Sequence, residues 1–312
     1  MIVFGPIPSR RLGQSLGVNN IPLKNCPYDC IYCQVGSTSS DAFTKQAFYS
    51  PKEIFQSVQK RVKEVQAAGR HIDYLSIVPD GEPSLDLQLG TTIQALRPLG
   101  IKIAVITNAS LLWQEKICQQ LALADLVSLK VDAAEEVVWR KINRPNRRLS
   151  LTDILLGALR LAEDFGGTLI TETMLVKGIN DQEASLQAIA RFLGQLDPEV
   201  AYLAIPTRPP TGKSIQSPDE TILNRAYQIF SQRVRKAECL TGFSADTFSA
   251  TGDVLQNLLN ITAVHPVREC EVQSLLQRGG CGAQELDQLV DQGKLVRVLH
   301  QDLPFCVRKF SA

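Results

Sequence analysis

The sequence lacks a long hydrophobic run, a hydrophobic leader and an excess of charge of either sign. No apolar stretch approaches the roughly 18 residues that a membrane-spanning helix needs, so we expect no membrane contact. The opening MIVFGPIPSRR holds too short an apolar stretch for a secretory signal peptide. The net charge of +1 predicts no strong attraction toward nucleic acid or a membrane surface.

The chain is also poor in cysteine for its length, with eight in 312 residues. That density excludes a disulfide-stapled scaffold, and we therefore expect a cytoplasmic protein in reducing surroundings. A hydrophobic fraction of 44% is ordinary for a globular protein, and a chain of this length can bury a large core. One barrel with a small appended domain fits these bounds.

Three of the cysteines stand together at the spacing C-x3-C-x2-C, at Cys26, Cys30 and Cys33. An odd number of thiols cannot pair among themselves, and no histidine or fourth cysteine lies nearby to complete a structural zinc site. Thiolates are the ligands of iron–sulfur clusters, and three of them on a four-iron cube leave one iron open. The intervening Pro27–Asp29 makes this a polar turn, which argues against three cysteines that merely share a core.

Six apolar segments with the features of buried strands alternate with helical patterns. They cover residues 15–23, 71–78, 101–106, 126–131, 168–176 and 200–205. This alternation predicts an α/β fold with a parallel sheet, of the partial (β/α)6 TIM-like barrel type. Capping boxes that begin at Ser50 and Ser217 mark two helix starts.

Polar residues follow the strands in this pattern, where the chemistry of such barrels gathers. Besides the cysteine loop, these residues are Glu82, Asn108, Asp132, Lys177 and Arg208. Because the carboxyl ends of parallel strands share one edge of the sheet, the pattern predicts a single site at that edge.

The cysteine spacing, with Tyr32 directly before the third cysteine, resembles that of the radical S-adenosylmethionine (SAM) superfamily. The resemblance implies that Cys26, Cys30 and Cys33 hold a [4Fe–4S] cluster and that SAM chelates its open iron. It implies that one electron from the cluster splits the sulfonium C–S bond, and that the resulting 5′-deoxyadenosyl radical abstracts a hydrogen. By the same resemblance, Tyr32 would lie along the adenine.

The stretch Gly81-Glu82-Pro83 resembles the GGEP element of that superfamily, with Asp80 where the first glycine often sits. The resemblance makes these residues SAM contacts, because the Glu82 carboxylate can accept hydrogen bonds from the methionyl ammonium group. The alternative is a Gly-Pro turn with a solvated glutamate.

Asn108 and Asp132 are further candidate cofactor contacts. Asn108 can offer both a donor and an acceptor to a ribose or a carboxylate, or it can simply begin a turn. Asp132 could accept ribose hydroxyls, or it could cap the segment Ala133–Trp139. The sequence leaves both pairs of alternatives open.

Four other motifs resemble one branch of the superfamily, the iron–sulfur oxidoreductases related to 4-demethylwyosine synthase, which rebuilds a guanine in tRNA. They are PSRRLG from Pro8, KINRP from Lys141, VKGIND from Val176 and PTRPP from Pro206, and the resemblance covers residues 1–236. Arg144 and Arg208 lie in these motifs. They would bind carboxylates or phosphates of the cofactor bidentately, or else form surface ion pairs.

One departure from that branch concerns the number of clusters. The synthase has further cysteines near its N-terminus for a second cluster, whereas this chain has none before Cys26. The five remaining cysteines are scattered, and we expect them to be free thiols. Wyosine chemistry is therefore not expected.

Composition changes near Leu240 and predicts a barrel domain of residues 1–239 and a C-terminal domain of residues 240–312. Three helices and a hairpin are expected in the second part, and they resemble a winged-helix domain, which commonly places one helix in a DNA groove. Six basic residues stand there against eight acidic ones, so DNA binding is not favoured. A protein-contacting or substrate-presenting role is expected instead.

The sequence thus predicts a radical SAM enzyme that acts on an unidentified substrate, with RNA and protein as the substrate classes in view. Its partner would be an external one-electron donor of the flavodoxin or ferredoxin type. The alternative is an iron–sulfur redox sensor that binds nucleic acid through the C-terminal domain. A sensor would not need Glu82, Asn108 and Arg144 at strand ends, and the enzyme is therefore favoured.

Overall fold

The structure is a computed structural model, and it describes most of the chain. The described residues are 1–9, 11–36, 43–206, 215–240, 254–264, 267–300 and 302–308. None of the helices within these ranges is long and apolar enough to cross a membrane.

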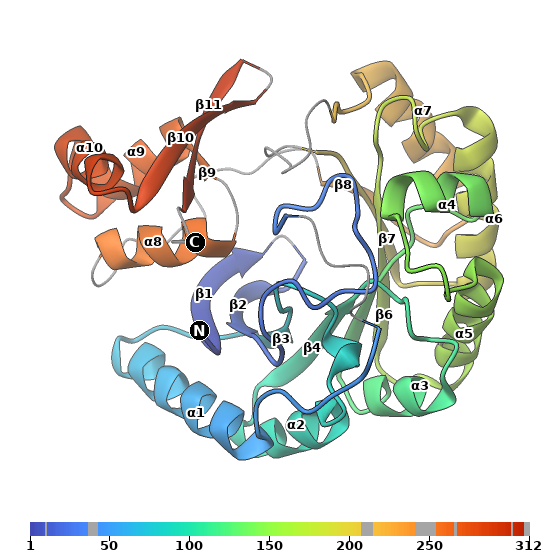
Figure 1. Ribbon diagram of the computed structural model, residues 1–312, viewed down its shortest axis with the longest axis horizontal. Helices are drawn as coiled ribbons and strands as arrows, with labels where there is room; N and C mark the ends of the chain where they lie inside the picture. The colour runs from blue at the N-terminus through green and yellow to red at the C-terminus, as the bar shows by residue number, and fades with distance from the viewer. Residues whose placement is uncertain are drawn as a thin grey trace.

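An eight-stranded sheet, curled into a half-barrel, forms the larger part of the molecule (Figure 1). Its strands follow one another in sequence order: β1 (Val3–Ser9), β2 (Gly13–Val18), β3 (Tyr74–Ile77), β4 (Lys102–Thr107), β5 (Leu126–Lys130), β6 (Thr168–Met174), β7 (Val200–Ala204) and β8 (Ala237–Leu240). Strand β1 is antiparallel to β2, and every later pair is parallel. The predicted α/β partial barrel is confirmed.

The crossover helices cover the outer face of this sheet (Figure 1). They are α1 (Pro51–Ala67), α2 (Leu89–Leu96), α3 (Glu115–Leu121), α4 (Glu136–Asn143), α5 (Leu151–Asp164), α6 (Glu183–Leu196) and α7 (Glu220–Ser231), with short 3-10 turns at Pro83–Leu85 and Arg97–Leu99. Of the capping box predicted at Ser50, the structure shows the serine half, since the Ser50 hydroxyl accepts a hydrogen bond from the Glu53 amide. The one predicted at Ser217 is wrong, because Asp219 caps α7 and Ser217 donates to the Pro206 carbonyl.

Alternate residues along the strands pack on opposite faces, as the pleat requires. On β4, for example, Ile103 and Val105 join the large core between sheet and helices. Ala104, between them, joins a smaller apolar cluster inside the curl of the sheet, together with Ile170 of β6 and Tyr202 of β7. The inner face near the carboxyl ends of the strands is more polar, and this is where the candidate site lies.

Two strands of the sheet are not predicted by the sequence, and both lie at its edges. Strand β1 contains Gly5, Pro6 and Pro8, which weaken a strand pattern but are tolerated at an edge. Strand β8 has only four residues and includes Leu240, which pairs with Ala204 of β7. The sheet therefore reaches one residue past the predicted domain boundary.

The C-terminal part contains α8 (Val254–Val264), β9 (Val267–Arg268), α9 (Glu269–Arg278), α10 (Ala283–Asp291), β10 (Leu295–His300) and β11 (Leu303–Arg308). Its strands form an antiparallel sheet in the order β10-β11-β9. The predicted hairpin is present, and the short strand β9 is an addition. The apolar core of this part includes Phe4 and Ile7 of β1, so it packs directly on the edge of the barrel sheet.

Candidate active site

The three clustered cysteines lie on the loop that leaves β2, at the carboxyl edge of the parallel sheet. All three are half-buried. The Cys33 amide donates to the Cys30 carbonyl at 2.9 Å and closes a turn between the last two. The structure therefore places all three predicted cluster ligands on one short, ordered segment, hereafter the cluster loop (residues 26–33).

The cluster loop is held by residues 142–146, which comprise the last two residues of α4 and the three that follow it. The Ile31 amide donates to the Ile142 carbonyl at 2.9 Å, and the Asn146 amide donates to the Pro27 carbonyl at 2.8 Å. Tyr28 and Pro145 form an antiparallel bridge between the two segments. This pairing gives the KINRP motif a physical role, because its backbone supplies the partners that a loop without regular structure otherwise lacks.

Beneath this pairing, two aromatic side chains fix the base of the loop. The Trp139 indole N–H donates to the Tyr28 hydroxyl at 3.2 Å, and their rings meet edge to face at 5.8 Å. Both residues are buried. The contact anchors the loop between its first two cysteines to helix α4.

Two asparagine side chains donate hydrogen bonds to the cysteine sulfurs. Asn108, at the end of β4, donates to Cys26 Sγ at 3.1 Å, and Asn143 donates to Cys30 Sγ at 3.3 Å. Asn108 also accepts from the Ser110 amide, so the turn predicted as the alternative for Asn108 is present as well. Hydrogen bonds to the sulfurs are one means by which proteins set the reduction potential of a cluster.

Glu82 is fully buried, so the alternative of a solvated glutamate is wrong. Its Oε1 accepts from the Ser84 amide at 3.0 Å and from the Thr107 hydroxyl at 2.6 Å. Its Oε2 accepts from the Asn108 amide at 2.7 Å. Burial raises the pKa of Glu82, and these hydrogen bonds oppose the rise. The carboxylate thereby fixes the ends of β3 and β4, including the asparagine that contacts Cys26.

Gly81 and Pro83 serve the same turn through the backbone. A Cβ at Gly81 would stand 2.2 Å from the Asn25 carbonyl oxygen, so only glycine allows this approach to the cluster loop. The Glu82 amide donates to that same carbonyl at 2.8 Å. Pro83 is buried at the first position of a 3-10 turn, and its carbonyl accepts from the Asn20 side chain. The turn after β3 is thus shaped to fit the start of the cluster loop.

Asp132, at the end of β5, is buried and binds three partners. It accepts from the Tyr32 hydroxyl, from the Asn143 side chain at 2.8 Å and from the Met174 amide at 2.8 Å. The alternative of Asp132 as a helix cap is wrong, because Glu135 occupies the capping position of α4. Asp132 therefore joins the cluster loop to both β5 and β6.

The structure describes only one of the two arginines that were predicted to contact the cofactor. The Arg144 side chain is largely exposed and lies 3.9 Å from the Asp29 carboxylate, at the edge of the cluster loop. Its backbone is left-handed, with φ 43°, where α4 ends. Arg208 lies outside the described residues.

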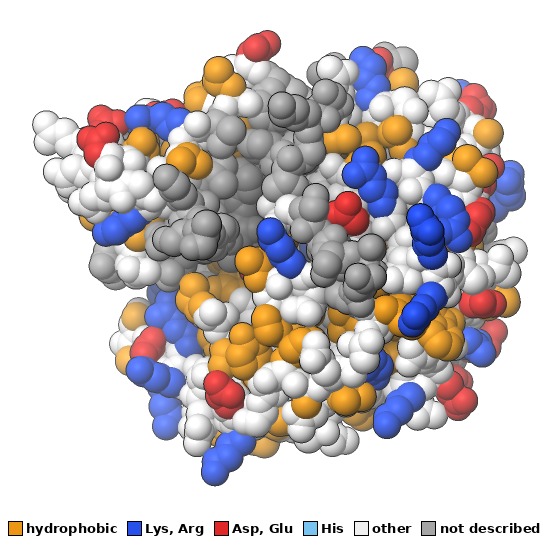
Figure 2. Space-filling model, viewed as in Figure 1, with side chains coloured by type: hydrophobic (Ala, Val, Ile, Leu, Met, Phe, Trp, Pro, Cys, Tyr) orange, Lys and Arg blue, Asp and Glu red, His pale blue; other side chains and the backbone are white. Residues whose placement is uncertain are grey.

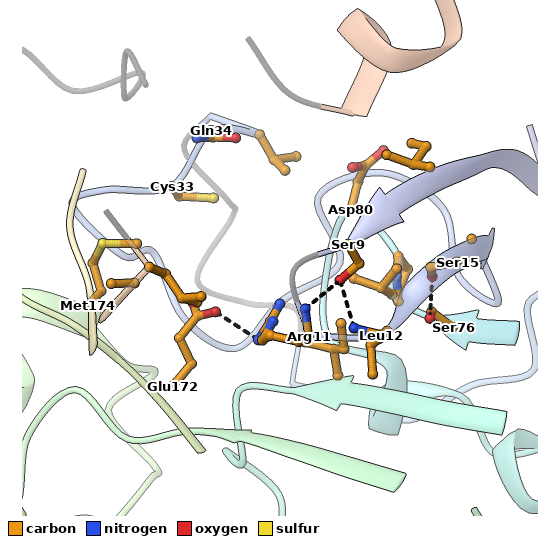
Figure 3. Close-up of a pocket in the computed structure, with 18 of the residues that line it drawn as sticks. Ser9, Arg11, Leu12, Ser15, Cys33, Gln34, Ser76, Asp80, Glu172 and Met174 are labelled. Atoms are coloured by element: carbon orange, nitrogen blue, oxygen red, sulfur yellow. Dashed lines mark hydrogen bonds and ion pairs between the residues drawn. The ribbon is translucent and has the colours of Figure 1, made fainter. Parts of the chain in front are cut away.

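A cavity of about 460 Å³ opens beside the cluster loop inside the curl of the sheet (Figure 3). Cys33 and Tyr32 line it on one side, and Asp80, Arg11 and Glu172 line it elsewhere. Tyr32 is the one predicted cofactor contact among the described residues that lines it. The cavity is large enough for a small-molecule ligand next to the third cysteine.

An ionic network that sequence reasoning missed lies at this cavity. Arg11, in the turn after β1, approaches Glu172 of β6 with its guanidinium at 2.7 Å from the carboxylate (Figure 3). Lys130 of β5 approaches the other carboxylate oxygen at 2.6 Å and stands 4.9 Å from the centre of the Tyr32 ring. Burial lowers the pKa of Lys130, but the carboxylates of Glu172 and Asp132 outweigh this and raise it. The sequence does contain a signal for this network, because Lys130 and Glu172 are charged residues within otherwise apolar strands of a parallel sheet.

The cysteine set fits an iron–sulfur cube better than a single metal ion. Among the described residues, no three His, Cys, Asp or Glu side chains converge on one ion position. The three cysteines would instead hold a larger iron–sulfur cluster, whose several irons would not require them to meet at one point. Burial raises the pKa of the Cys30 thiol to about 12 and that of Cys26 well above its ordinary value. Bare thiolates are thus disfavoured here, and a positively charged iron core would offset that cost.

Comparisons with known proteins agree with this geometry. The family model described as "Radical SAM superfamily" matches residues 20–189, and the chain belongs to this superfamily. The chain is 40% identical, over its whole length and 97% of the relative, to the UPF0026 protein MJ1312 of Methanocaldococcus jannaschii. It is accordingly a radical SAM enzyme, and its cofactors are a [4Fe–4S] cluster and SAM.

Two solved structures share the fold at low sequence identity. A radical SAM methyltransferase from Sphaerobacter thermophilus is 19% identical, with a TM-score of 0.57 over 74% of this chain and 67% of that one. A structure of TYW1 with a lysine-pyruvate adduct bound is 15% identical, with a TM-score of 0.55 over 75% and 77%. These likenesses confirm the barrel architecture.

The contact between Asn143 and Cys30 yields a testable prediction. Replacing Asn143 by alanine removes a donor to the sulfur and a partner of Asp132. We expect the reconstituted variant to lose iron to a chelator roughly 10- to 100-fold faster than the unaltered protein. Asn25→Ala is the matched control, because the Asn25 side-chain amide donates to the Pro22 carbonyl and, among the described contacts, to no sulfur. Equal rates of iron loss in the two variants would contradict the assignment.

Proposed function

We propose that this enzyme cleaves SAM reductively and uses the resulting 5′-deoxyadenosyl radical to abstract a hydrogen from a substrate held in the cavity beside Cys33. The observation that carries the proposal is the cavity itself, which touches the cluster loop on one side and half-buried charged residues on another. When bound, the cluster supplies the electron that splits the sulfonium bond. The chain's own residues hold the reactants and exclude water.

Tyr32 is suited to hold the adenine. Its ring lines the cavity, its hydroxyl is bound by Asp132, and Lys130 packs against it. These contacts leave the ring little freedom to turn, so a flat ligand would meet a preformed surface. In this proposal Asp132 holds Tyr32 in position and acts on the cofactor only through that ring, so it does not itself bind the ribose.

Gly81, Glu82, Pro83 and Asn108 are proposed to shape the methionyl end of the SAM site. Each lies on a turn that meets the cluster loop next to Cys26. Glu82 already accepts hydrogen bonds from three residues, so its contribution is to orient backbone groups at the ends of β3 and β4. Arg144, at the edge of the cluster loop, stays a proposed anion contact, and so does Arg208, which lies outside the described residues.

The Arg11–Glu172 ion pair is proposed to select the substrate. It lies in the cavity wall and is half-buried, and a charge-assisted contact there would be stronger than a neutral one. A substrate with a carboxylate or phosphate group could bind Arg11, while an amine or hydroxyl could bind Glu172. This chemistry fits a small polar substrate or one polar residue of an RNA or a protein. It favours an enzyme over a redox-sensing regulator, which needs no such cavity.

The reaction also needs surroundings that keep the cluster reduced. We propose that the protein works in the cytoplasm and receives single electrons from a low-potential carrier of the flavodoxin or ferredoxin type. The open iron of the predicted cluster makes the protein sensitive to oxygen.

The central test is cleavage of SAM. Anaerobically reconstituted protein should bind about four irons per chain. With dithionite as reductant it should release 5′-deoxyadenosine and methionine even without substrate. Cys30→Ala should lose both properties, because the cluster then lacks a ligand. Cys118→Ala, which removes a half-buried thiol of α3, is the control and should keep both. Iron retained after replacement of all three loop cysteines would contradict their assignment as the cluster ligands.

We further propose that the C-terminal part, residues 240–312, is a winged-helix-like domain that presents the substrate to the cavity. The element order α8-β9-α9-α10-β10-β11 supports the comparison with winged helices. Phe4, Ile7 and Val78 line the cavity and also pack against the core of this part. A partner bound to it would therefore be held next to the cavity wall.

Removal of the C-terminal part tests this role. A chain ending at Leu240 should still cleave SAM with dithionite, because no proposed cluster ligand lies beyond that residue. It should unfold at a lower temperature, because Phe4 and Ile7 lose their apolar cover. Normal iron content with no SAM cleavage would show that this part completes the catalytic site instead.

The intact protein should bind duplex DNA weakly at physiological salt, which an anisotropy titration measures.

A further inference from the structure

A run of basic residues borders the cluster loop, and none of them lines the cavity. We call it the basic rim, and its members are exposed: Arg140, Lys141, Arg144, Arg147 and Arg148. Figure 2 shows Lys and Arg side chains gathered over this part of the barrel, around α4. For a chain with a net charge of +1, this is a marked local excess of one sign.

Among the described residues, three of the five rim side chains have no ion-pair partner. Arg140 pairs with Glu136 within α4, and Arg144 lies 3.9 Å from Asp29. Within the described part of the chain, no carboxylate lies within ion-pair distance of Lys141, Arg147 or Arg148. Arg148 instead stacks over the Phe43 ring at 5.9 Å. Exposed cations without partners keep their hydration and attract an anionic surface from a distance.

The basic rim is connected to the cluster loop through backbone hydrogen bonds. Residues 142–146, which lie among its members, are the segment whose backbone binds residues 27–31 of that loop. Asn143, also within it, donates directly to Cys30 Sγ at 3.3 Å. No rim residue lines the cavity, which the loop borders through Tyr32 and Cys33 instead. A partner on the rim would approach the cluster without entering the substrate cavity.

We propose that the basic rim is the docking surface for an acidic one-electron carrier protein that reduces the cluster. This inference rests on the proposed function, because only a cluster that must be reduced repeatedly needs such a carrier. One electron passes from the reduced flavin or iron–sulfur centre of the carrier to the oxidised cluster, and the carrier leaves oxidised by one electron. No atom is transferred.

The position of the rim distinguishes this partner from an RNA substrate. An RNA that undergoes chemistry must place a nucleotide in the cavity, whose charged lining residues within the described chain are Arg11, Asp80 and Glu172 and include no member of the rim. An electron carrier needs only to bring its redox centre close to the cysteines from outside. Transient electron-transfer complexes are small and rely on charge for their encounter, which a short cationic rim suits.

The test compares two charge-reversal variants of the reconstituted, cluster-containing protein. The rim variant carries Lys141→Glu, Arg147→Glu and Arg148→Glu, none of which touches the cluster loop cysteines or the cavity. The matched control carries Lys52→Glu, Lys60→Glu and Lys63→Glu, three exposed lysines of α1. Both variants change the net charge by the same amount.

The first readout is binding of purified oxidised flavodoxin, an acidic carrier, measured by calorimetry at low ionic strength. The rim variant should bind roughly tenfold or more weakly than the unaltered protein, and the control should bind as the unaltered protein does. The second readout is the rate at which photoreduced flavodoxin bleaches the visible absorbance of the cluster. This rate should fall in the rim variant and decline with added salt, whereas reduction by dithionite should be the same in all three proteins.

Equal flavodoxin affinity in the rim and control variants would overturn the inference. So would a rim variant that loses dithionite-driven SAM cleavage, because the rim would then belong to the catalytic site. Tight binding of tRNA by the unaltered protein that the rim variant alone loses, with flavodoxin reduction unchanged, would assign the rim to a nucleic acid. Failure of the proposed function looks different, since the unaltered protein would then cleave no SAM with dithionite.

Discussion

The backbone pairing between residues 27–31 and residues 142–146 is the contact on which the site depends. The cluster loop has no regular structure of its own, and its amides and carbonyls would otherwise face water or remain unpaired. By binding the C-terminal end of α4 and the residues that follow it, the loop brings Cys30 to the Asn143 side chain. The residues of the basic rim stand within and directly beside this segment, so the stretch that holds the cluster loop is also exposed to solvent through Arg144 and its basic neighbours.

A second layer of contacts ties this pairing to the sheet. Glu82 fixes the ends of β3 and β4, and Asp132 joins β5 to Tyr32 and Asn143. Both carboxylates are buried, and both are satisfied by several donors, as buried charges must be. The strand ends therefore act as a rigid frame for a loop that must keep three cysteines in fixed positions while a cofactor and a substrate come and go.

Much of the architecture could be predicted because its determinants are local. The six central strands are apolar runs between turn signals, and the cysteine spacing identifies a cluster by ligand chemistry alone. Strands β1 and β8 could not be predicted in this way, since one contains a glycine and two prolines and the other has four residues.

The site's inner contacts depend on residues far apart in the chain, and a single sequence does not reveal them. Asn143 and Cys30 are 113 residues apart, and Arg11 meets Glu172 only because the sheet curls. Glu82 stands in a Gly-Pro turn and is typical of a solvated residue, yet the end of β4 buries it completely. Conversely, the KINRP motif is plain in the sequence, but its role as the backbone partner of the cluster loop appears only in three dimensions.

The most direct measurement of the central claim is the electron paramagnetic resonance spectrum of the reduced, reconstituted protein with and without SAM. A cube held by Cys26, Cys30 and Cys33 keeps one iron free, so SAM should change the spectrum of the reduced cluster by binding that iron. The replacement of any one of these cysteines should abolish the signal. A spectrum that is identical with and without saturating SAM would contradict the account.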